Sequence, residues 1–169
     1  ARVGVLYGGN GAEREISLLT GQAFGKALTT KGYQAELYDL PAALEGFLVD
    51  PPEVVLLALH GDGEEGTIQG LLEVLGVSYT GSGVLASALC MDKERAKAVM
   101  RARGVSVAEG IVLERTVLES VENFDALLQA QRWDRSRGYV IKPTDSGSSH
   151  GVFVLDAGDD PGEALASSI

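Results

Sequence analysis

The sequence predicts an α/β protein built on a doubly wound parallel sheet, and three observations support this prediction. Short apolar runs alternate with segments of helical periodicity along the first half of the chain, which is the pattern of repeated strand–helix units. Residues 54–59 form a continuous apolar run, as expected of a strand that is covered on both faces. Glycine-rich turns follow the apolar runs, where ligands bind in open sheets of this class.

Composition limits the class of protein before any motif is considered. The chain has 169 residues, of which 45% are hydrophobic, enough for one medium domain or two small ones with a core. No apolar run approaches the ~18 residues of a membrane span, and no signal-peptide pattern opens the chain. Cys90 is the single cysteine, so no internal disulfide can form. We interpret it as a small buried apolar residue, which fits a reducing, cytoplasmic location.

The charge is negative and unevenly distributed. A net charge of −10 argues against nucleic acid and anionic membranes as main partners. Up to Cys90 there are 4 basic and 11 acidic residues, whereas from Met91 onward there are 10 and 13. The basic residues therefore concentrate where a nucleotide would bind, although a mixed solvated surface would look the same. This change predicts a boundary near Met91, with domains over 1–91 and 92–169.

The first strand, turn and helix are predicted over 3–7, 8–11 and 13–31. Gly9-Asn10-Gly11 is followed by Ala12 and Glu13, so the dinucleotide fingerprint G-x-G-x-x-G is not met. Four apolar residues recur at helical spacing and predict the face that packs on the sheet: Ile16, Leu19, Ala23 and Ala27.

The other elements follow from the same patterns. Strands are predicted over 34–39, 54–59, 77–79, 109–113, 139–141 and 152–155, and helices over 41–48, 67–75, 84–91, 93–103, 119–131 and 161–167. Asp92 is expected to cap the helix 93–103, in which Lys93, Lys97 and Arg101 share one face. We interpret Lys97 and Arg101 as solvated.

Two polar residues lie just beyond predicted strand ends. Glu13 begins the first helix, and His60 follows the apolar run 54–59. Because the carboxyl ends of parallel strands share one edge of the sheet, we expect both residues to face one crevice. Glu13 would there hold a substrate ammonium group, or else only pair with the helix dipole. His60 has a structural alternative as well.

A strand–loop–strand stretch, Tyr139 to Gly151, reads Y-V-I-K-P-T-D-S-G-S-S-H-G. Lys142 ends the predicted strand, and Pro143 prevents it from continuing as a central ladder member. Backbone N–H groups and hydroxyls of the Gly/Ser loop, with the lysine ammonium beside them, suit a phosphate group. The alternative is an ordinary solvated hairpin loop.

Six segments, in order, make the chain resemble the D-alanine–D-alanine ligase family of ATP-grasp enzymes. They are Gly8-Gly9 with Ala12 to Ser17, Leu59 to Gly61, Gly66 to Gly70, Tyr79 to Gly83, Ala86 to Lys93, and Val140 to Pro143 with Gly147 to Ser149. The resemblance covers essentially the whole chain. It implies a Rossmann-like, pre-ATP-grasp substrate domain followed by part of an α+β ATP-grasp central domain.

The resemblance also implies a reaction and its participants. ATP phosphorylates the carboxylate of one D-alanine, and the amine of a second D-alanine attacks the acyl phosphate, a step of peptidoglycan synthesis. ATP, Mg²⁺, D-alanine, a cytoplasmic location and a homodimer are expected, without nucleic acid or membrane. In this sequence Glu13 and Ser148 match catalytic positions, and Glu13 and His60 match substrate contacts. ATP-binding positions are matched by Lys93, Lys142, Gly147, Ser148 and Ser149.

Three departures from the family pattern stand out. The segment after His60 is one residue short, so Glu64 and Glu65 cannot be assigned, and His150 replaces an aliphatic residue. The adenine hinge, substrate-loop tyrosine and metal ligands of the family have no counterpart in this sequence, so no metal ligand is assigned. We therefore expect this chain by itself to lack ligase activity. A non-catalytic substrate- or nucleotide-binding module, or a relative that joins D-alanine to D-lactate or D-serine, remain the alternatives.

Overall fold

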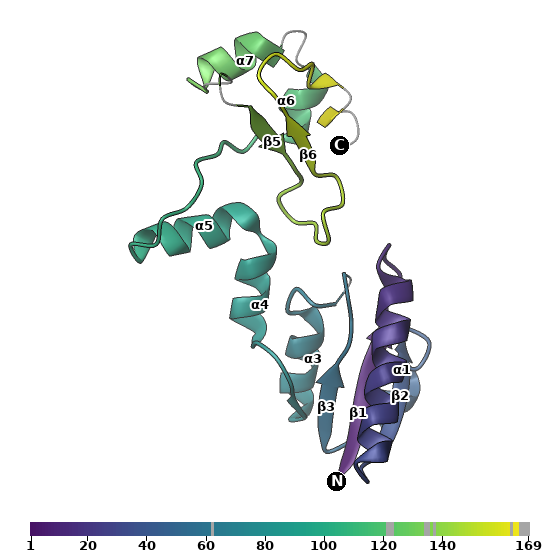
Figure 1. The fold of residues 1–169 in the computed structure, drawn as a ribbon. Helices are drawn as coiled ribbons and strands as arrows, with labels where there is room; N and C mark the ends of the chain where they lie inside the picture. The colour runs from purple at the N-terminus through teal and green to yellow at the C-terminus, as the bar shows by residue number, and fades with distance from the viewer. Residues whose placement is uncertain (62, 121–123, 134–135, 137, 163, 166–169) are drawn as a thin grey trace. The chain divides into compact units, whose positions relative to one another are not determined.

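The structure is a computed structural model that describes residues 1–61, 63–120, 124–133, 136, 138–162 and 164–165 (Figure 1). The chain divides into two compact units, Ala1–Cys90 and Met91–Ile169. Each unit has its own sheet, and we describe each by itself.

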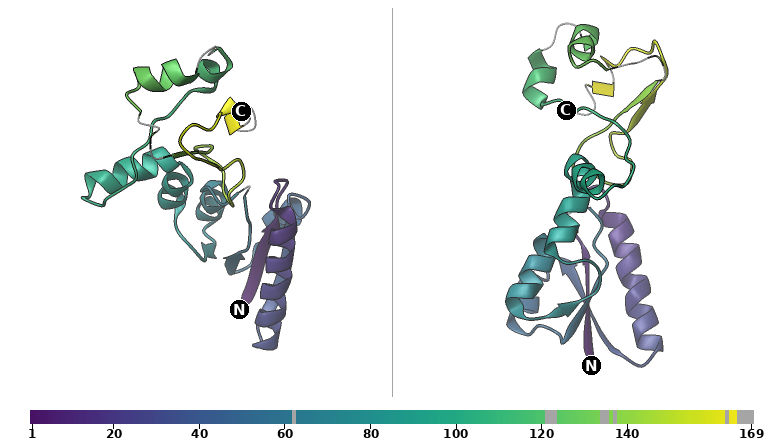
Figure 2. Two further views of the ribbon diagram at one scale, coloured as in Figure 1. Left: turned by 45° about the horizontal axis from the view of Figure 1, so that its top comes forward. Right: turned by 90° about the vertical axis from the view of Figure 1, so that its left-hand side faces the viewer.

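The sheet of the first unit is parallel throughout. Its strands β1 (Arg2–Gly8), β2 (Gln34–Leu40), β3 (Val54–Leu57) and β4 (Ser78–Tyr79) lie in the order β2-β1-β3-β4. Helix α1 (Arg14–Thr30) covers one face and α3 (Thr67–Leu75) the other (Figure 2). The doubly wound α/β fold predicted from the sequence is therefore confirmed.

The core of this unit lies between the sheet and its helices. Leu6, Val55 and Leu72 are fully buried, as is Phe47 of the short helix α2 (Leu44–Val49). Strand β3 ends two residues earlier than predicted, but Ala58 and Leu59 after it remain buried. The apolar run 54–59 reflects burial beyond the strand as well as within it.

The face of α1 that packs on the sheet is not the predicted one. Its buried residues are Ser17, Gly21 and Gly25, whereas Ile16 and Leu19 are 55% and 65% exposed. A Cβ atom at Gly21 would lie 2.5 Å from Cγ of Tyr7, so the helix backbone approaches too closely for a larger side chain. The prediction of an Ile16–Leu19–Ala23–Ala27 core face was wrong because close packing selected the small-residue face.

Ser17 joins three elements through one buried hydroxyl. Its Oγ accepts from the backbone N–H of Gly8 and donates to the carbonyl of Ala58, each at 2.7 Å. Ser17→Ala would leave both backbone groups buried without a partner. We expect a loss of roughly 2–4 kcal/mol in the free energy of unfolding, measured by urea denaturation. Thr30→Val, which removes an exposed hydroxyl on the same helix, should change it by under about 0.5 kcal/mol.

An ion-pair network ties β1 to β2. The Arg2 guanidinium contacts the Glu36 carboxylate at 2.8 and 2.9 Å and Asp50 at 3.0 Å. The Arg2 contact and a hydrogen bond from Tyr38 lower the pKa of Glu36 to about 2. Burial and the Glu36 contact in turn raise the pKa of Tyr38 to about 12.

This network predicts a pH-dependent stability in acid. Because the folded-state pKa of Glu36 lies below its ordinary value of 4.5, its contribution is present above about pH 5 and is lost as the pH falls toward 2. The melting temperature of the wild type should exceed that of Glu36→Gln at pH 6, and the difference should shrink through this window. An equal response to Glu109→Gln, an exposed carboxyl in the second unit, would contradict the assignment.

The second unit contains helices and a hairpin. Helix α4 (Val84–Met91) belongs to the first unit except for Met91. The second unit comprises α5 (Lys93–Ala102), α6 (Arg115–Ser120), α7 (Phe124–Ala130), β5 (Tyr139–Ile141) and β6 (Phe153–Leu155). Strands β5 and β6 pair antiparallel. Asp92 caps α5 as predicted, accepting from the backbone N–H groups of Glu94 and Arg95.

Several predictions in this region need correction. Residues 109–113 are not a strand, because no described strand pairs with them and Gly110 instead faces the ammonium of Lys97. Of the helix predicted over 119–131, residues 119–120 belong to α6, which begins earlier than predicted, and 124–130 belong to α7; residues 121–123 lie outside the described part. Cys90 is exposed rather than buried. The predicted helix 161–167 lies partly outside the described residues; 162, 164 and 165 are helical.

Candidate functional site

Glu13 lies against the chain segment that follows β3 and contains His60. Glu13 directly precedes α1 and makes no side-chain capping hydrogen bond, so it does not act as an ordinary cap. A Cβ atom at Gly61, next to His60, would lie 3.7 Å from Cβ of Glu13. The chain beyond β3 therefore packs against Glu13, as expected from the parallel topology.

Arg14 holds the turn that precedes Glu13. Its guanidinium forms a bidentate ion pair with Asp39, both contacts at 2.8 Å, and donates to the carbonyl of Gly9 at 2.9 Å. The hydrogen bond to Asp39 raises the pKa of Arg14. A Cβ atom at Gly8 would lie 2.2 Å from the Asp39 carboxylate, so the turn accepts only glycine there. This bracing positions the start of α1.

Two glutamates follow His60, and they make contacts of different kinds. Glu65 accepts from the backbone N–H of Gly63 at 2.7 Å and from the hydroxyl of Thr67. Burial acts to raise the pKa of Glu65, but these hydrogen bonds outweigh it and the pKa is lowered. Glu65 therefore shapes the turn before α3. The backbone carbonyl of Glu64 accepts from Gln69 at 3.3 Å.

Lys93 is docked onto the Gly/Ser loop of the second unit. Its ammonium donates to the carbonyl of Ser146 and, at 3.4 Å, to that of Thr144, which also accepts from the Lys93 backbone at 2.9 Å. Burial first, and then the charge of Lys142, lower the pKa of Lys93. Lys93 is thus held by the loop, and Lys142 directly precedes it, an arrangement of two cations and loop donors that suits phosphate oxygens.

The loop itself has an unusual backbone. Ser148 and Ser149 have φ values of 46° and 61°, in the left-handed region that is rarely occupied by residues other than glycine. The turn is closed by hydrogen bonds from the His150 N–H to the Gly147 carbonyl at 3.0 Å and from the Ser146 hydroxyl to the His150 carbonyl at 3.1 Å. Such strain is typical of ligand-binding loops.

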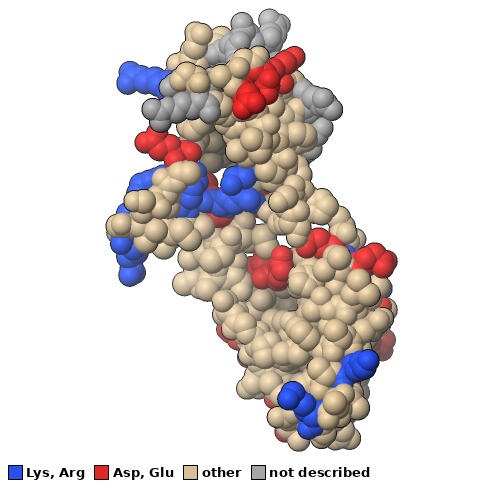
Figure 3. Space-filling model, in the orientation of Figure 1, with Lys and Arg blue, Asp and Glu red and all other residues tan. Residues whose placement is uncertain are grey.

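Basic side chains gather over α5 (Figure 3). Arg101 is exposed, as predicted. Lys97 is not fully solvated, because its side chain is 25% exposed and pairs with Glu94 at 2.9 Å. The prediction for Lys97 was therefore wrong: the segment around Gly110 lies against it.

The structure thus forms two groups of predicted site residues, one in each unit. Glu13 and His60 form the first; Lys93, Lys142, Gly147, Ser148 and Ser149 form the second. Their convergence in one cleft remains a prediction. The sequence did not reveal Thr20, which contacts His60 from 40 residues away in the chain. It also did not reveal the loop carbonyls that hold Lys93, since backbone acceptors carry no sequence signal.

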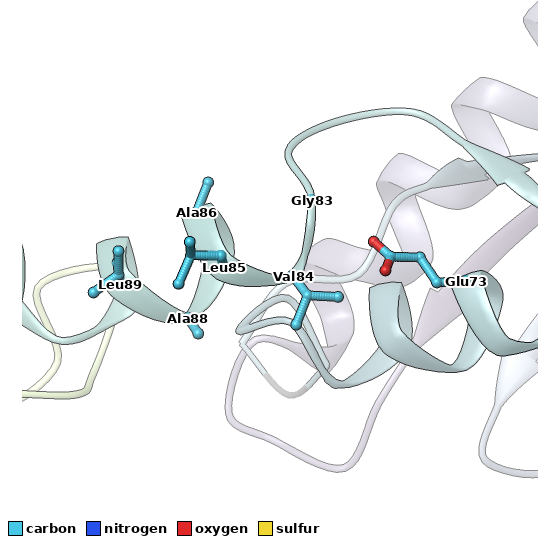
Figure 4. A pocket seen from close by; sticks show the side chains of 7 residues that line it. All are labelled: Glu73, Gly83, Val84, Leu85, Ala86, Ala88 and Leu89. Carbon is cyan, nitrogen blue, oxygen red and sulfur yellow. The ribbon is translucent and has the colours of Figure 1, made fainter.

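The described residues contain no group of three His, Cys, Asp or Glu side chains placed to hold a metal ion. None of the helices they form is long and apolar enough to cross a membrane. A shallow hollow lies where α3 meets α4, lined mainly by aliphatic side chains and Glu73 (Figure 4). It contains none of the predicted site residues.

Comparison with known proteins gives a consistent result, although no family model matches the chain. The chain is 48% identical over 168 residues to the D-alanine--D-alanine ligase of Methylorubrum populi and 42% identical over 160 residues to that of Chromohalobacter salexigens. These matches cover 98% and 94% of this chain, and 51% and 48% of the relatives.

Solved structures agree. The D-alanine--D-alanine ligase of Bacillus anthracis matches with a TM-score of 0.77 at 34% identity, covering 98% of this chain and 51% of that one. The same ligase complexed with ATP matches with a TM-score of 0.75 at 33% identity. The chain spans about half the length of the curated relatives that it matches.

Proposed function

We propose that this chain, a homologue of the D-alanine–D-alanine ligases over 98% of its length, provides the first-substrate domain and part of the ATP-binding domain of such a ligase. The identity of 48% over 168 residues carries the proposal, because it spans every residue to which a role is assigned. The parent enzyme would join two D-alanines for peptidoglycan synthesis in the cytoplasm and act as a homodimer.

The substrate side of the proposal rests on the first unit. Glu13 holds the ammonium group of the first D-alanine, and His60, in the segment that packs against Glu13, positions the carboxylate. An anionic side chain and an imidazole on these two segments suit a zwitterionic amino acid, which presents one group of each charge. The braced turn at Arg14 and Asp39 keeps Glu13 in place.

The nucleotide side rests on the second unit. When bound, ATP supplies the phosphoryl group that activates the first carboxylate. Lys93 and Lys142 neutralise phosphate charge, and the Gly147–Ser149 loop donates hydrogen bonds to the phosphate oxygens. Ser148 also matches a catalytic position of the family, and we assign it a role in catalysis. The described residues offer no ligand set for Mg²⁺, so we assign that ion to no residue of this chain.

A chimera tests the proposal. This chain would be joined to the part of the Methylorubrum populi ligase that follows the matched region. We expect ATP- and D-alanine-dependent release of phosphate and formation of D-alanyl-D-alanine, both lost in Glu13→Gln. Circular dichroism and gel filtration would verify that the chimera is folded.

The acceptor and the alternatives are tested in the same assay. Turnover with D-serine or D-lactate in preference to D-alanine would favour a relative with a different acceptor. A folded chimera that binds nucleotide and D-alanine but never releases phosphate, beside an active Methylorubrum populi ligase, would favour a binding module and overturn the proposal.

A further inference from the structure

The hydroxyl of Thr20 on α1 contacts two groups at once. Its Oγ1 lies 2.9 Å from the carbonyl oxygen of Ile16, one turn earlier in the helix, and 3.2 Å from Nε2 of His60. A hydroxyl carries one proton, and a carbonyl oxygen can only accept. Both contacts are hydrogen bonds in the arrangement in which Thr20 donates its proton to Ile16 and its oxygen accepts from His60.

This arrangement implies a protonation state for His60. When the Thr20 oxygen accepts, Nε2 of His60 carries a hydrogen and donates it. Turning the ring by half a revolution about its Cβ–Cγ bond would place a carbon opposite the hydroxyl and forfeit the hydrogen bond. Thr20 thereby selects one tautomer and one ring orientation, as second partners of histidine generally do.

We propose that Thr20 is a positioning residue that holds His60 by Nε2–H and leaves Nδ1 as the nitrogen offered to the substrate; the substrate part rests on the proposed function. Nε2–H is present in both the neutral ring and the imidazolium, so the contact persists when Nδ1 gains or loses a proton. Nδ1 then donates to a carboxylate when protonated and accepts from an ammonium when neutral.

The helix that carries Thr20 begins directly after Glu13. One rigid element therefore positions both residues that are proposed to contact the amino acid. Thr20 itself touches neither reacting group, and its effect passes through His60.

Nuclear magnetic resonance of the ¹⁵N-labelled 169-residue chain tests this directly. The chain has only two histidines, and His150→Gln assigns the signals of His60. At a pH where the ring is neutral, we expect a protonated Nε2, an unprotonated Nδ1 and an observable Nε2–H signal. In Thr20→Val, which keeps the shape but removes the acceptor, exchange of this hydrogen with water should become roughly tenfold faster.

Two variants control the measurement. Thr20→Ser keeps the hydroxyl and should restore the slow exchange. Thr29→Val removes the same kind of bond, from Thr29 to the Gly25 carbonyl at 2.9 Å, on the same helix but with no described histidine contact, and should leave the His60 signals unchanged. An unprotonated Nε2 in the wild type, or equal spectra of Thr20→Val and wild type, would overturn the proposal.

The functional part has a separate readout. In the chimera, Thr20→Val should raise the KM for the first D-alanine roughly tenfold with a smaller change in the KM for ATP, and Thr20→Ser should recover it. An inactive chimera with the expected imidazole signals would refute the proposed function and not the Thr20 contact. An unchanged KM in an active chimera would refute the positioning role.

Discussion

Replacing Lys142 by alanine is expected to abolish phosphate release by the chimera and to weaken binding of ATP to it by roughly a hundredfold or more, with little change in stability. Lys142 directly follows β5 and is exposed, so its removal leaves no cavity. Burial first, and then the charge of Lys142, lower the pKa of Lys93, which the same loop holds. Replacing Lys142 removes one of the two lysine charges that we assign to phosphate at this loop.

Calorimetric titration and thermal melting would check this result together. Arg101→Ala is the matched control, because Arg101 is an exposed basic residue of the same unit with no proposed role. This substitution should change neither the affinity for ATP nor the melting temperature appreciably. Lys93→Ala should differ from both, since it also removes the bonds to the Thr144 and Ser146 carbonyls. A fall of many degrees in the melting temperature of Lys142→Ala, with turnover retained, would instead mean a structural role.

Gly21→Ala is expected to cause a large loss of stability although it adds only one methyl group. The added methyl group would lie 2.5–2.7 Å from three atoms of the Tyr7 side chain, within contact distances that packed atoms do not tolerate. Either α1 must move off β1 or Tyr7 must leave its place, and overpacking of this kind costs about 3 kcal/mol. Urea denaturation followed by far-ultraviolet circular dichroism would measure the loss.

Gly46→Ala provides the comparison. Gly46 lies within α2, and nothing is within 4 Å of the added methyl group. Alanine there should stabilise the protein by about 0.5–1 kcal/mol, because it restricts the unfolded chain and favours the helix. If both substitutions proved neutral, the close approach of α1 to the sheet would be wrong.

The patterns of the sequence were sufficient for the order of elements in the first unit. Strands and helices there fall within a few residues of their predicted positions, and α3 and α4 match their predicted bounds. The periodicity of apolar residues predicted the wrong buried face of α1. The helix packs on the sheet through its small residues, and a hydrophobic pattern does not identify a face of that kind. The periodicity failed again at 109–113, because a strand needs a partner that local sequence does not reveal.

Some features of the candidate site could likewise be predicted from the sequence, and others only from the structure. Residue types after strand ends pointed to Glu13, His60 and Lys142 before any coordinates. The docking of Lys93 on backbone carbonyls, and the contact between Thr20 and His60, could not be inferred in that way, because both depend on backbone atoms and on elements distant in sequence.

The sequence by itself determined the alternation of strands and helices, the change of charge near Met91 and the identity of the polar residues at the strand ends. These follow from local composition and spacing, which act over a few residues. Only the tertiary structure decided which face of α1 is buried, which lysine is held by the loop and which side chain contacts Nε2 of His60. Those outcomes depend on distances of a few tenths of an ångström between segments far apart in the chain, where packing and hydrogen bonding are most sensitive.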